Sequence, residues 1–147
     1  MKSGYGPEKE DLAEMKAFFA NDYFAKNAGI EILAVRRAQR GRPSYAKCGM
    51  RVTENHLNAS GYVMGGAIYT LADLTAAVAS NVGQPVTVSQ AGQISYLRGA
   101  DCRMLYAEAE STFSGKKTNF TEVSVRDENG TLIAKATFNG FRILKES

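Results

Sequence analysis

The stretch Gly65-Gly66-Ala67-Ile68-Tyr69-Thr70-Leu71-Ala72-Asp73-Leu74-Thr75-Ala76-Ala77-Val78-Ala79 decides the fold of this chain. Apolar residues occupy every face of this segment at helical spacing, which predicts a helix enclosed by other structure. One carboxylate, Asp73, interrupts the pattern. At helical spacing its neighbours are Tyr69, Thr70, Ala76 and Ala77, so no Lys or Arg on the same helix neutralises its charge. A group outside the helix must therefore bind or neutralise the carboxylate of Asp73.

Two interpretations of Asp73 are open from the residues alone. In the first, a backbone amide or a distant arginine binds the carboxylate, and its role is structural. In the second, the carboxylate is a catalytic base. Poor solvation raises the pKa of a carboxyl group toward neutrality, which suits it to take a proton from water.

The rest of the chain predicts a second helix and a set of strands. From about Lys9 to Asn27, apolar residues recur at spacings of three and four between charged ones, which predicts one amphipathic helix. Six segments have the alternation and turn boundaries of strands: about 30–35, 44–52, 86–97, 102–113, 118–127 and 131–144. The first two are expected to form a hairpin around Gly41-Arg42-Pro43, and Asn129-Gly130 is the sharpest turn signal.

This element order predicts an α+β fold in one domain, residues 1–147. A curved antiparallel sheet of about six strands is expected to wrap around the long central helix, with the amphipathic helix at an edge and a core of about 30–144. One strand shows the two faces of the sheet. Leu105, Ala107, Ala109 and Phe113 are expected to share its buried face, and Glu108 and Glu110 its solvated face.

Composition narrows the functional classes. The net charge of +3 comes from interspersed acidic and basic residues, which argues against a dedicated nucleic-acid surface. Cys48 and Cys102 are too few for a disulfide framework, and no Cys/His cluster suggests a metal. The apolar run around Asp73 is shorter than the roughly 20 residues of a membrane span, and the N-terminus does not resemble a secretory signal. We therefore expect a soluble cytoplasmic protein with free thiols and no membrane partner.

A longer motif leads into the helix: Asn58-Ala59-Ser60-Gly61-Tyr62-Val63-Met64-Gly65-Gly66-Ala67-Ile68-Tyr69-Thr70-Leu71-Ala72-Asp73. It resembles the signature of hotdog-fold acyl-CoA thioesterases of the PaaI-like, phenylacetate-degradation type, where Asn, Gly, His-Gly-Gly and Leu-x-Asp follow in order. Gln93-Ile94-Ser95-Tyr96-Leu97-Arg98 and Gly115-Lys116-Lys117 are also similar to that family. The resemblance spans roughly residues 30–141. The spacing of Asn58, Gly65 and Asp73 is specific, whereas a Gly-Gly pair alone is usually a turn or cap.

The resemblance implies hydrolysis of an acyl-CoA thioester to free acid and coenzyme A, without a separate cofactor. In such enzymes the backbone N–H matching Gly65 polarises the thioester carbonyl, and the residue matching Asp73 is the general base or nucleophile. The residues matching Asn58 and Ser89 help to place substrate and water. Further substrate contacts are expected from Tyr62, Met64, Gly66 and Tyr69 near the acyl group, and from Arg98, Lys116 and Lys117 at the coenzyme A phosphates.

Physical arguments support part of this assignment. The first amide hydrogens of a helix are unpaired and carry partial positive charge, so Gly65 and Gly66 form a natural oxyanion site that a thioester reaches closely. The alternative is a simple N-cap that permits close helix entry. Gly65 and Asp73 lie roughly 12 Å apart along one helix. If both act on one thioester, they must come from two subunits, which predicts a homodimer with shared sites and, by resemblance, a dimer of dimers.

Met64 stands where the family has its usual His, and Met does not donate the hydrogen bond that imidazole donates. The single His of the chain, His56, lies two residues before Asn58 and is expected to pack in a loop. The departure at Met64 leaves a second function open, a non-catalytic acyl-CoA-binding or regulatory hotdog protein. A hotdog dehydratase or hydratase is disfavoured, because nothing near Asp73 in the motif supplies a second acid/base group.

Overall fold

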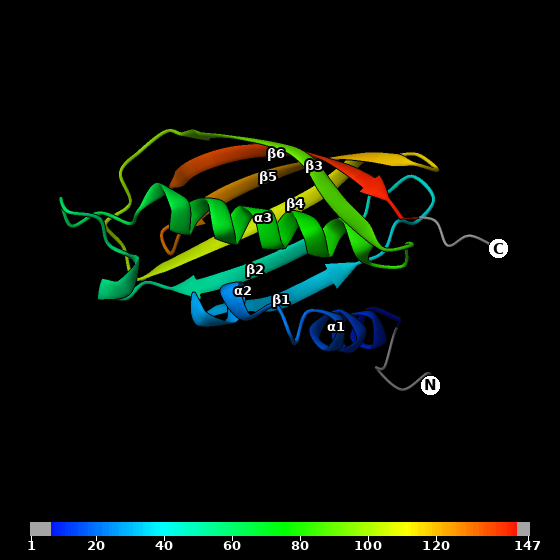
Figure 1. The fold of residues 1–147 in the computed structure, drawn as a ribbon, viewed down its shortest axis with the longest axis horizontal. Coiled ribbons are helices and arrows are strands. Elements are labelled where there is room, and N and C mark those ends of the chain that lie inside the picture. Colours follow the sequence, from blue (N-terminus) through cyan, green and yellow to red (C-terminus); the bar gives the residue numbers. More distant parts are fainter. Residues whose placement is uncertain (1–6, 144–147) are drawn as a thin grey trace.

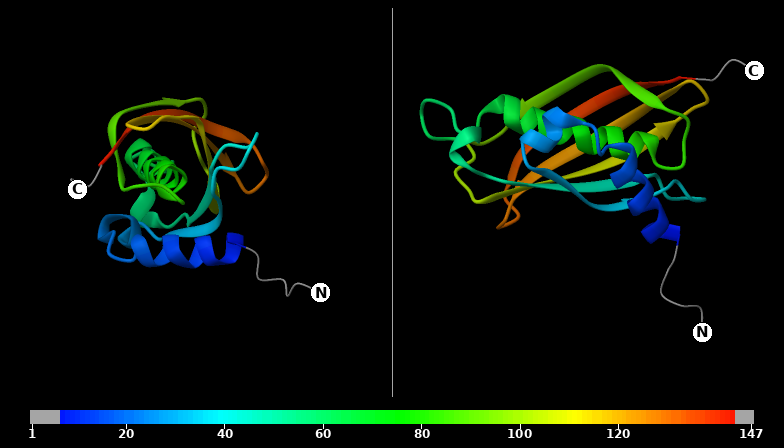
Figure 2. Two further views of the ribbon diagram at one scale, coloured as in Figure 1. Left: turned by 90° about the vertical axis from the view of Figure 1, so that its right-hand side faces the viewer. Right: turned by 60° about the horizontal axis from the view of Figure 1, so that its bottom comes forward.

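The computed structural model describes residues 7–143 and has one long helix, α3 (Gly65–Asn81), enclosed by a curved antiparallel sheet (Figure 1). The sheet has the strand order β1-β2-β4-β5-β6-β3 and bends around the helix (Figure 2). Its strands are β1 (Ile30–Arg36), β2 (Tyr45–Arg51), β3 (Thr87–Tyr96), β4 (Met104–Ser114), β5 (Thr118–Asp127) and β6 (Leu132–Arg142). The predicted fold, the six strands and the first hairpin are confirmed.

The core lies between α3 and the concave face of the sheet. Leu71 and Val78 of the helix are fully buried, as are Met50 on β2 and Leu105 on β4. The C-terminal end of α3 is fixed by Asn81, whose side chain donates to Thr87 O at 3.1 Å and accepts from Thr87 N at 2.8 Å. Because Thr87 begins β3, this pair of bonds sets where the helix ends and the edge strand starts.

One stripe of α3 is open, so the prediction of a helix buried on every face is wrong at this stripe. Gly66 is exposed, and Thr70, Asp73 and Ala77 are each partly exposed. These positions follow one another at spacings of three and four and therefore share one side of the helix. The neighbouring elements cover that side only in part, and Asp73 lies at its middle.

The N-terminal segment forms two helices, α1 (Pro7–Phe18) and α2 (Tyr23–Asn27), and the single helix predicted for 9–27 is wrong. The break has a local cause. The side chain of Asp22 accepts a hydrogen bond from Ala25 N at 3.2 Å and caps a new helix. A buried carboxylate on α1, Asp11, is bound by the guanidinium of Arg37, with Nε at 2.9 Å, and this ion pair joins α1 to the end of β1.

Strand β4 changes face near its end. Leu105, Ala107 and Ala109 are buried as predicted, but Phe113 is 58% exposed, so its expected place on the buried face is wrong. A register shift between Ser111 and Phe113 relative to β5 is the reason, because an extra residue in one strand reverses the alternation beyond it. At the other end of the sheet, Asn129-Gly130 makes the predicted turn, with Gly130 at φ +82°.

Within the part of the chain that the structure describes, no helix is long and apolar enough to cross a membrane. Cys48 is buried, Cys102 is partly buried, and both are free thiols, as the sequence predicts.

Candidate active site

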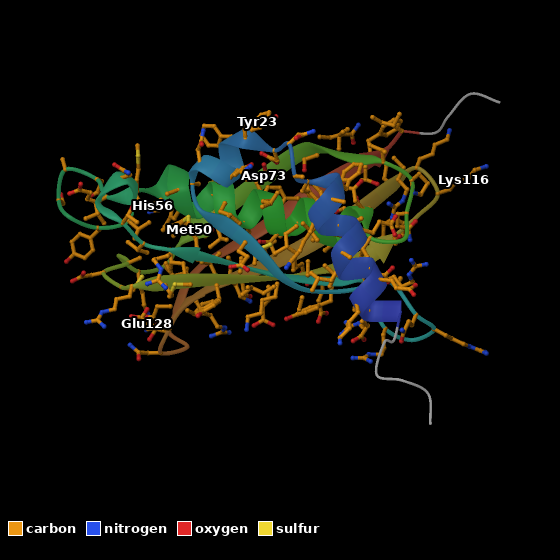
Figure 3. All side chains as sticks on the ribbon, turned by 90° about the horizontal axis from the view of Figure 1, so that it is seen from below. Tyr23, Met50, His56, Asp73, Lys116 and Glu128 are labelled. Atoms are coloured by element: carbon orange, nitrogen blue, oxygen red, sulfur yellow. The ribbon has the colours of Figure 1, made fainter. Side chains whose placement is uncertain are left out.

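The first cleft lies at the beginning of α3. It has a volume of about 530 Å³ and combines the loop before the helix with the end of β3 and the residues that follow it. Asn58, Tyr62, Gly65 and Arg98 all line it, so the structure brings four of the predicted site residues together. Figure 3 shows this end of α3 beside the labelled His56.

The helix start presents unpaired donors to this cleft. Among residues 7–143, the amides of Gly65 and Gly66 have no hydrogen-bond acceptor, whereas those of Ala67 and Ile68 both donate to Met64 O. Met64 is the N-cap residue and makes no side-chain capping bond. Unpaired amides and the helix dipole both favour negative charge at this position. The local geometry is therefore that of an oxyanion site at Gly65.

Tyr96 holds the first turn of α3 from the side of β3. Its hydroxyl donates to Gly65 O at 2.8 Å. A Cβ at residue 65 would lie 2.9 Å from Tyr96 Cζ, closer than real Cβ atoms approach, whereas a Cβ at Gly66 would meet nothing within 4 Å. Glycine at 65 is thus required by the Tyr96 ring, in addition to keeping the amide accessible.

Asn58 shapes the loop that enters the cleft. Its side-chain oxygen accepts from Ser60 N at 2.9 Å and from Tyr62 N at 3.1 Å. Because Oδ1 binds two donors, Nδ2 is the group that remains, and it has no partner among the described residues. Asn58 therefore orders the loop and offers one donor to the cleft.

The second cleft lies midway along the open stripe of α3. Asp73 lines it with Tyr69, Thr70 and Ala77 of its own helix, and the volume is about 300 Å³. The carboxylate of Asp73 has no hydrogen-bond partner and no ion pair within residues 7–143. Burial raises the pKa of Asp73 above its ordinary value, and the charge of Asp22 raises it further. No described residue supplies the backbone amide or arginine that a structural role requires.

The two clefts occupy different positions along one helix, because eight residues separate Gly65 from Asp73, or roughly 12 Å. No residue lines both. Within one chain, the unpaired amide and the unpaired carboxylate therefore do not face the same atom.

Comparison with known proteins identifies the family. The model of the thioesterase superfamily matches residues 60–134, about half of the chain, including Gly65 and Asp73. A putative esterase of Archaeoglobus fulgidus is 34% identical over 123 residues, which cover 83% of this chain and 80% of that protein. The chain belongs to the thioesterase superfamily.

Two further comparisons, one of sequence and one of structure, refine the place of this thioesterase. The acyl-coenzyme A thioesterase PaaI of Escherichia coli K12 is 29% identical over 119 residues, 80% of this chain and 81% of that protein. The structure of the E. coli PaaI protein from the phenylacetic acid degradation operon superposes with a TM-score of 0.83 at 25% identity. The superposition covers 95% of this chain and 97% of the E. coli chain. The predicted PaaI-like thioesterase of hotdog fold is thereby confirmed.

Several predicted site residues of the thioesterase lie outside both clefts. Met64 is 57% exposed, and neither it nor Gly66 lines a cleft. Ser89 is exposed on the edge strand β3. Lys116 and Lys117 are exposed in the turn between β4 and β5, at the opposite end of the molecule from His56 (Figure 3). The length of β4 puts them on the order of 30 Å from Arg98, so one chain does not assemble the predicted phosphate contacts.

His56 has a structural role, as expected. Its Nδ1 accepts from Thr53 N at 2.9 Å, and its Nε2 donates to Ala28 O at 2.7 Å. These bonds tie the short 3-10 helix Glu54–His56 to the end of α2. Met64 N donates to His56 O at 2.8 Å, so the same residue fixes the start of α3.

Sequence reasoning did not assign Tyr96, Asp22 or Phe24 to the clefts that these residues line. Tyr96 lies within the 93–98 stretch that resembles the family, and its aromatic ring was the one indication in the sequence that it contributes to the cleft. Asp22 and Phe24 line the cleft of Asp73. The sequence pattern places them in the amphipathic segment 9–27, and their spacing does not indicate contact with α3. Among the described residues, no group of three His, Cys, Asp or Glu side chains could hold a metal ion.

Proposed function

We propose that this thioesterase hydrolyses an acyl-CoA thioester to a free acid and coenzyme A. One observation carries the proposal: among the described residues, the amide of Gly65 has no acceptor and the carboxylate of Asp73 has no partner, and both groups lie on α3. Hydrolysis of a thioester needs a donor for the carbonyl oxygen and a base for water, and these are those two groups. The acyl-coenzyme A substrate class is supported by the name of the E. coli relative.

In the proposed reaction, Asp73 takes a proton from water as the water oxygen attacks the thioester carbon. The carbonyl oxygen becomes an oxyanion, and the N–H of Gly65 donates to it. The intermediate then collapses as the C–S bond breaks. The sulfur leaves with the electron pair and receives the proton that Asp73 held, which restores the carboxylate and releases the coenzyme A thiol. The raised pKa of Asp73 makes it a stronger base toward water than an ordinary carboxylate.

We propose a homodimer with shared sites, because Gly65 and Asp73 of one helix lie too far apart to act on one thioester. With the two helices related by a two-fold axis, Asp73 of each chain would lie near Gly65 of the other chain. The dimer would then have two equivalent sites. Two features support such an interface. The open stripe of α3 is only partly covered, and β3 is an edge strand that pairs only with β6 in the described chain. Its Val88 and Tyr96 are 45% and 48% exposed, which is unusual for a strand left in water.

The remaining site residues are assigned within this assembly. Asn58, through its free Nδ2, and Ser89 place the substrate and water, with Tyr62, Tyr69, Met64 and Gly66 near the acyl group. Arg98 of one chain would meet the coenzyme A phosphates together with Lys116 and Lys117 of another. Because these lysines lie far from the Arg98 of their own chain, the proposed phosphate contacts need a second chain, and the resemblance to the PaaI-like family implies a dimer of dimers as the full assembly.

The test is release of coenzyme A thiol from a panel of acyl-CoA substrates by the wild type and the Asp73→Asn variant. We expect turnover on part of the panel and a loss on the order of 10²- to 10⁴-fold in Asp73→Asn, with binding retained. Hydrolysis that survives the substitution would remove Asp73 from the mechanism. Binding without turnover in the wild type would instead establish the alternative, a non-catalytic acyl-CoA-binding protein, which the Met64 departure keeps open.

A further inference from the structure

The cleft of Asp73 has a wall that comes from the N-terminal segment. Asp22, Phe24 and Ala25 line it from α2, opposite the residues of α3. Figure 3 shows α2, marked by Tyr23, beside α3 at the labelled Asp73. None of the three belongs to the 60–134 segment that the family model matches. The segment that packs at the edge of the fold is therefore also part of the candidate site.

Asp22 is held in place by the helix that it begins. Its Oδ1 accepts from Ala25 N, and its carbonyl accepts from Lys26 N at 3.0 Å. A side chain fixed as an N-cap has little rotamer freedom, so its charge stays in one position relative to α3. Asp22 also borders a second groove, where Lys16, Lys26 and Glu31 are the other charged residues.

Among the described residues, no Lys or Arg lines the cleft that Asp73 and Asp22 share. Of the described residues that line it, the titratable ones are Asp73, Asp22 and Tyr69, and none is Lys or Arg. Asp73 therefore faces a second carboxylate across from it and a phenol on its own helix. Burial raises the pKa of Tyr69, and the charge of Asp73 raises it further, so the phenol stays neutral.

We propose that Asp22 is a positioning residue for hydrolysis that acts on Asp73 through its charge across the cleft. The inference rests on the proposed function. A second negative charge in the same partly buried cleft disfavours the ionised form of Asp73, which raises the pKa of Asp73 beyond the effect of burial. The base is thereby stronger, but it is protonated over a wider acidic range. Asp22 thus adds to burial in raising the lowest pH at which the enzyme works.

Asp22→Asn removes the charge of residue 22 but keeps its N-cap hydrogen bond, because Asn is as good an N-cap as Asp. We expect the acid limb of the pH profile of kcat/KM to move to lower pH in Asp22→Asn and in Asp22→Ser. The shift should shrink in about 1 M salt, because the cleft is partly open to solvent. Glu31→Gln is the matched control. It removes a carboxylate next to Asp22 that does not line the cleft of Asp73, and its acid limb should coincide with that of the wild type.

A titration without turnover keeps this inference separate from the proposed function. The side-chain carboxyl ¹³C signal of Asp73 is followed against pH in the wild type, Asp22→Asn and Asp22→Ser. A midpoint that falls in both variants and not in Glu31→Gln supports the coupling, even if no acyl-CoA is hydrolysed. Unchanged midpoints in the folded variants would overturn the role of Asp22, even if Asp73 proves to be catalytic.

Discussion

Gly65 and Gly66 begin α3, and we expect replacement by Ala to have different effects on stability at the two positions. Replacing Gly by Ala in a compatible conformation stabilises a protein by about 0.4–1 kcal/mol, because the unfolded chain loses freedom. A Cβ at Gly66 meets nothing within 4 Å, so Gly66→Ala should retain this gain. For a chain of this length, that is a rise in Tm of about 1–4 °C.

At Gly65 the same methyl group meets the Tyr96 ring at 2.9 Å. Relief to ordinary van der Waals contact requires a displacement of about 0.5 Å. This displacement disturbs the 2.8 Å bond from the Tyr96 hydroxyl to Gly65 O, worth about 0.5–1.5 kcal/mol. The loss offsets most or all of the gain, so Gly65→Ala should be less stable than Gly66→Ala, with a change in Tm between a rise of about 2 °C and a fall of about 4 °C. We also expect kcat/KM to fall, because residue 65 lines the cleft and residue 66 does not.

Thermal unfolding of both variants, each in the native and the Tyr96→Ala background, is the assay. Removing the ring should return the stabilising effect to Gly65→Ala and leave that of Gly66→Ala unchanged. Equal rises in Tm for the two variants with Tyr96 present would refute the account of why glycine is required at residue 65.

Three further predictions test other parts of the molecule. Because the pKa of Asp73 is raised in the folded protein, its ionisation opposes folding above that folded pKa and has no effect below the unfolded value. Asp73→Asn should therefore raise Tm at pH 7 but not at about pH 3, and a large fall in Tm at pH 7 would identify a structural carboxylate. Met64→His should restore a hydrogen-bond donor worth on the order of 1.5–3 kcal/mol and raise kcat/KM by about tenfold to a hundredfold. A fall in kcat/KM that comes mainly from a higher KM would instead put Met64 in the acyl pocket. Arg37→Ala, which leaves the buried Asp11 unpaired, should lower Tm more than Asp11→Ala, which leaves an exposed guanidinium, and the reverse order would contradict the ion pair.

The central helix and the sheet could be predicted because their patterns are local. Apolar spacing in 65–79 and alternation in the strands depend on neighbours in the sequence, and both survive in the structure. The predictions that were wrong depend on events that spacing does not record. The side chain of Asp22 caps a new helix within an amphipathic run, and a register shift after Ser111 turns Phe113 to solvent.

The candidate site was predictable in its components but not in its arrangement. The motif identified Asn58 and Gly65, which line one cleft, and Asp73, which lines another. The roles of Tyr96 and Asp22 depend on which distant segments lie against α3, and no local pattern carries that information. The open stripe of α3 was also hidden, because Gly, Ala and Thr are compatible with both a buried and an uncovered helix face.

The measurement that tests the shared site most directly is complementation in mixed assemblies. Gly65→Pro removes the amide donor, and Asp73→Asn removes the base. Because residue 65 lies against the Tyr96 ring, both variants also carry Tyr96→Ala, and the Tyr96→Ala protein alone is the reference. After subunit exchange at equal amounts, half of the dimers are mixed and each has one site with both groups intact. We predict activity of about a quarter of the reference, with each parent inactive. A mixture that exchanges subunits, as followed by labelled chains, and remains as inactive as its parents would contradict the account.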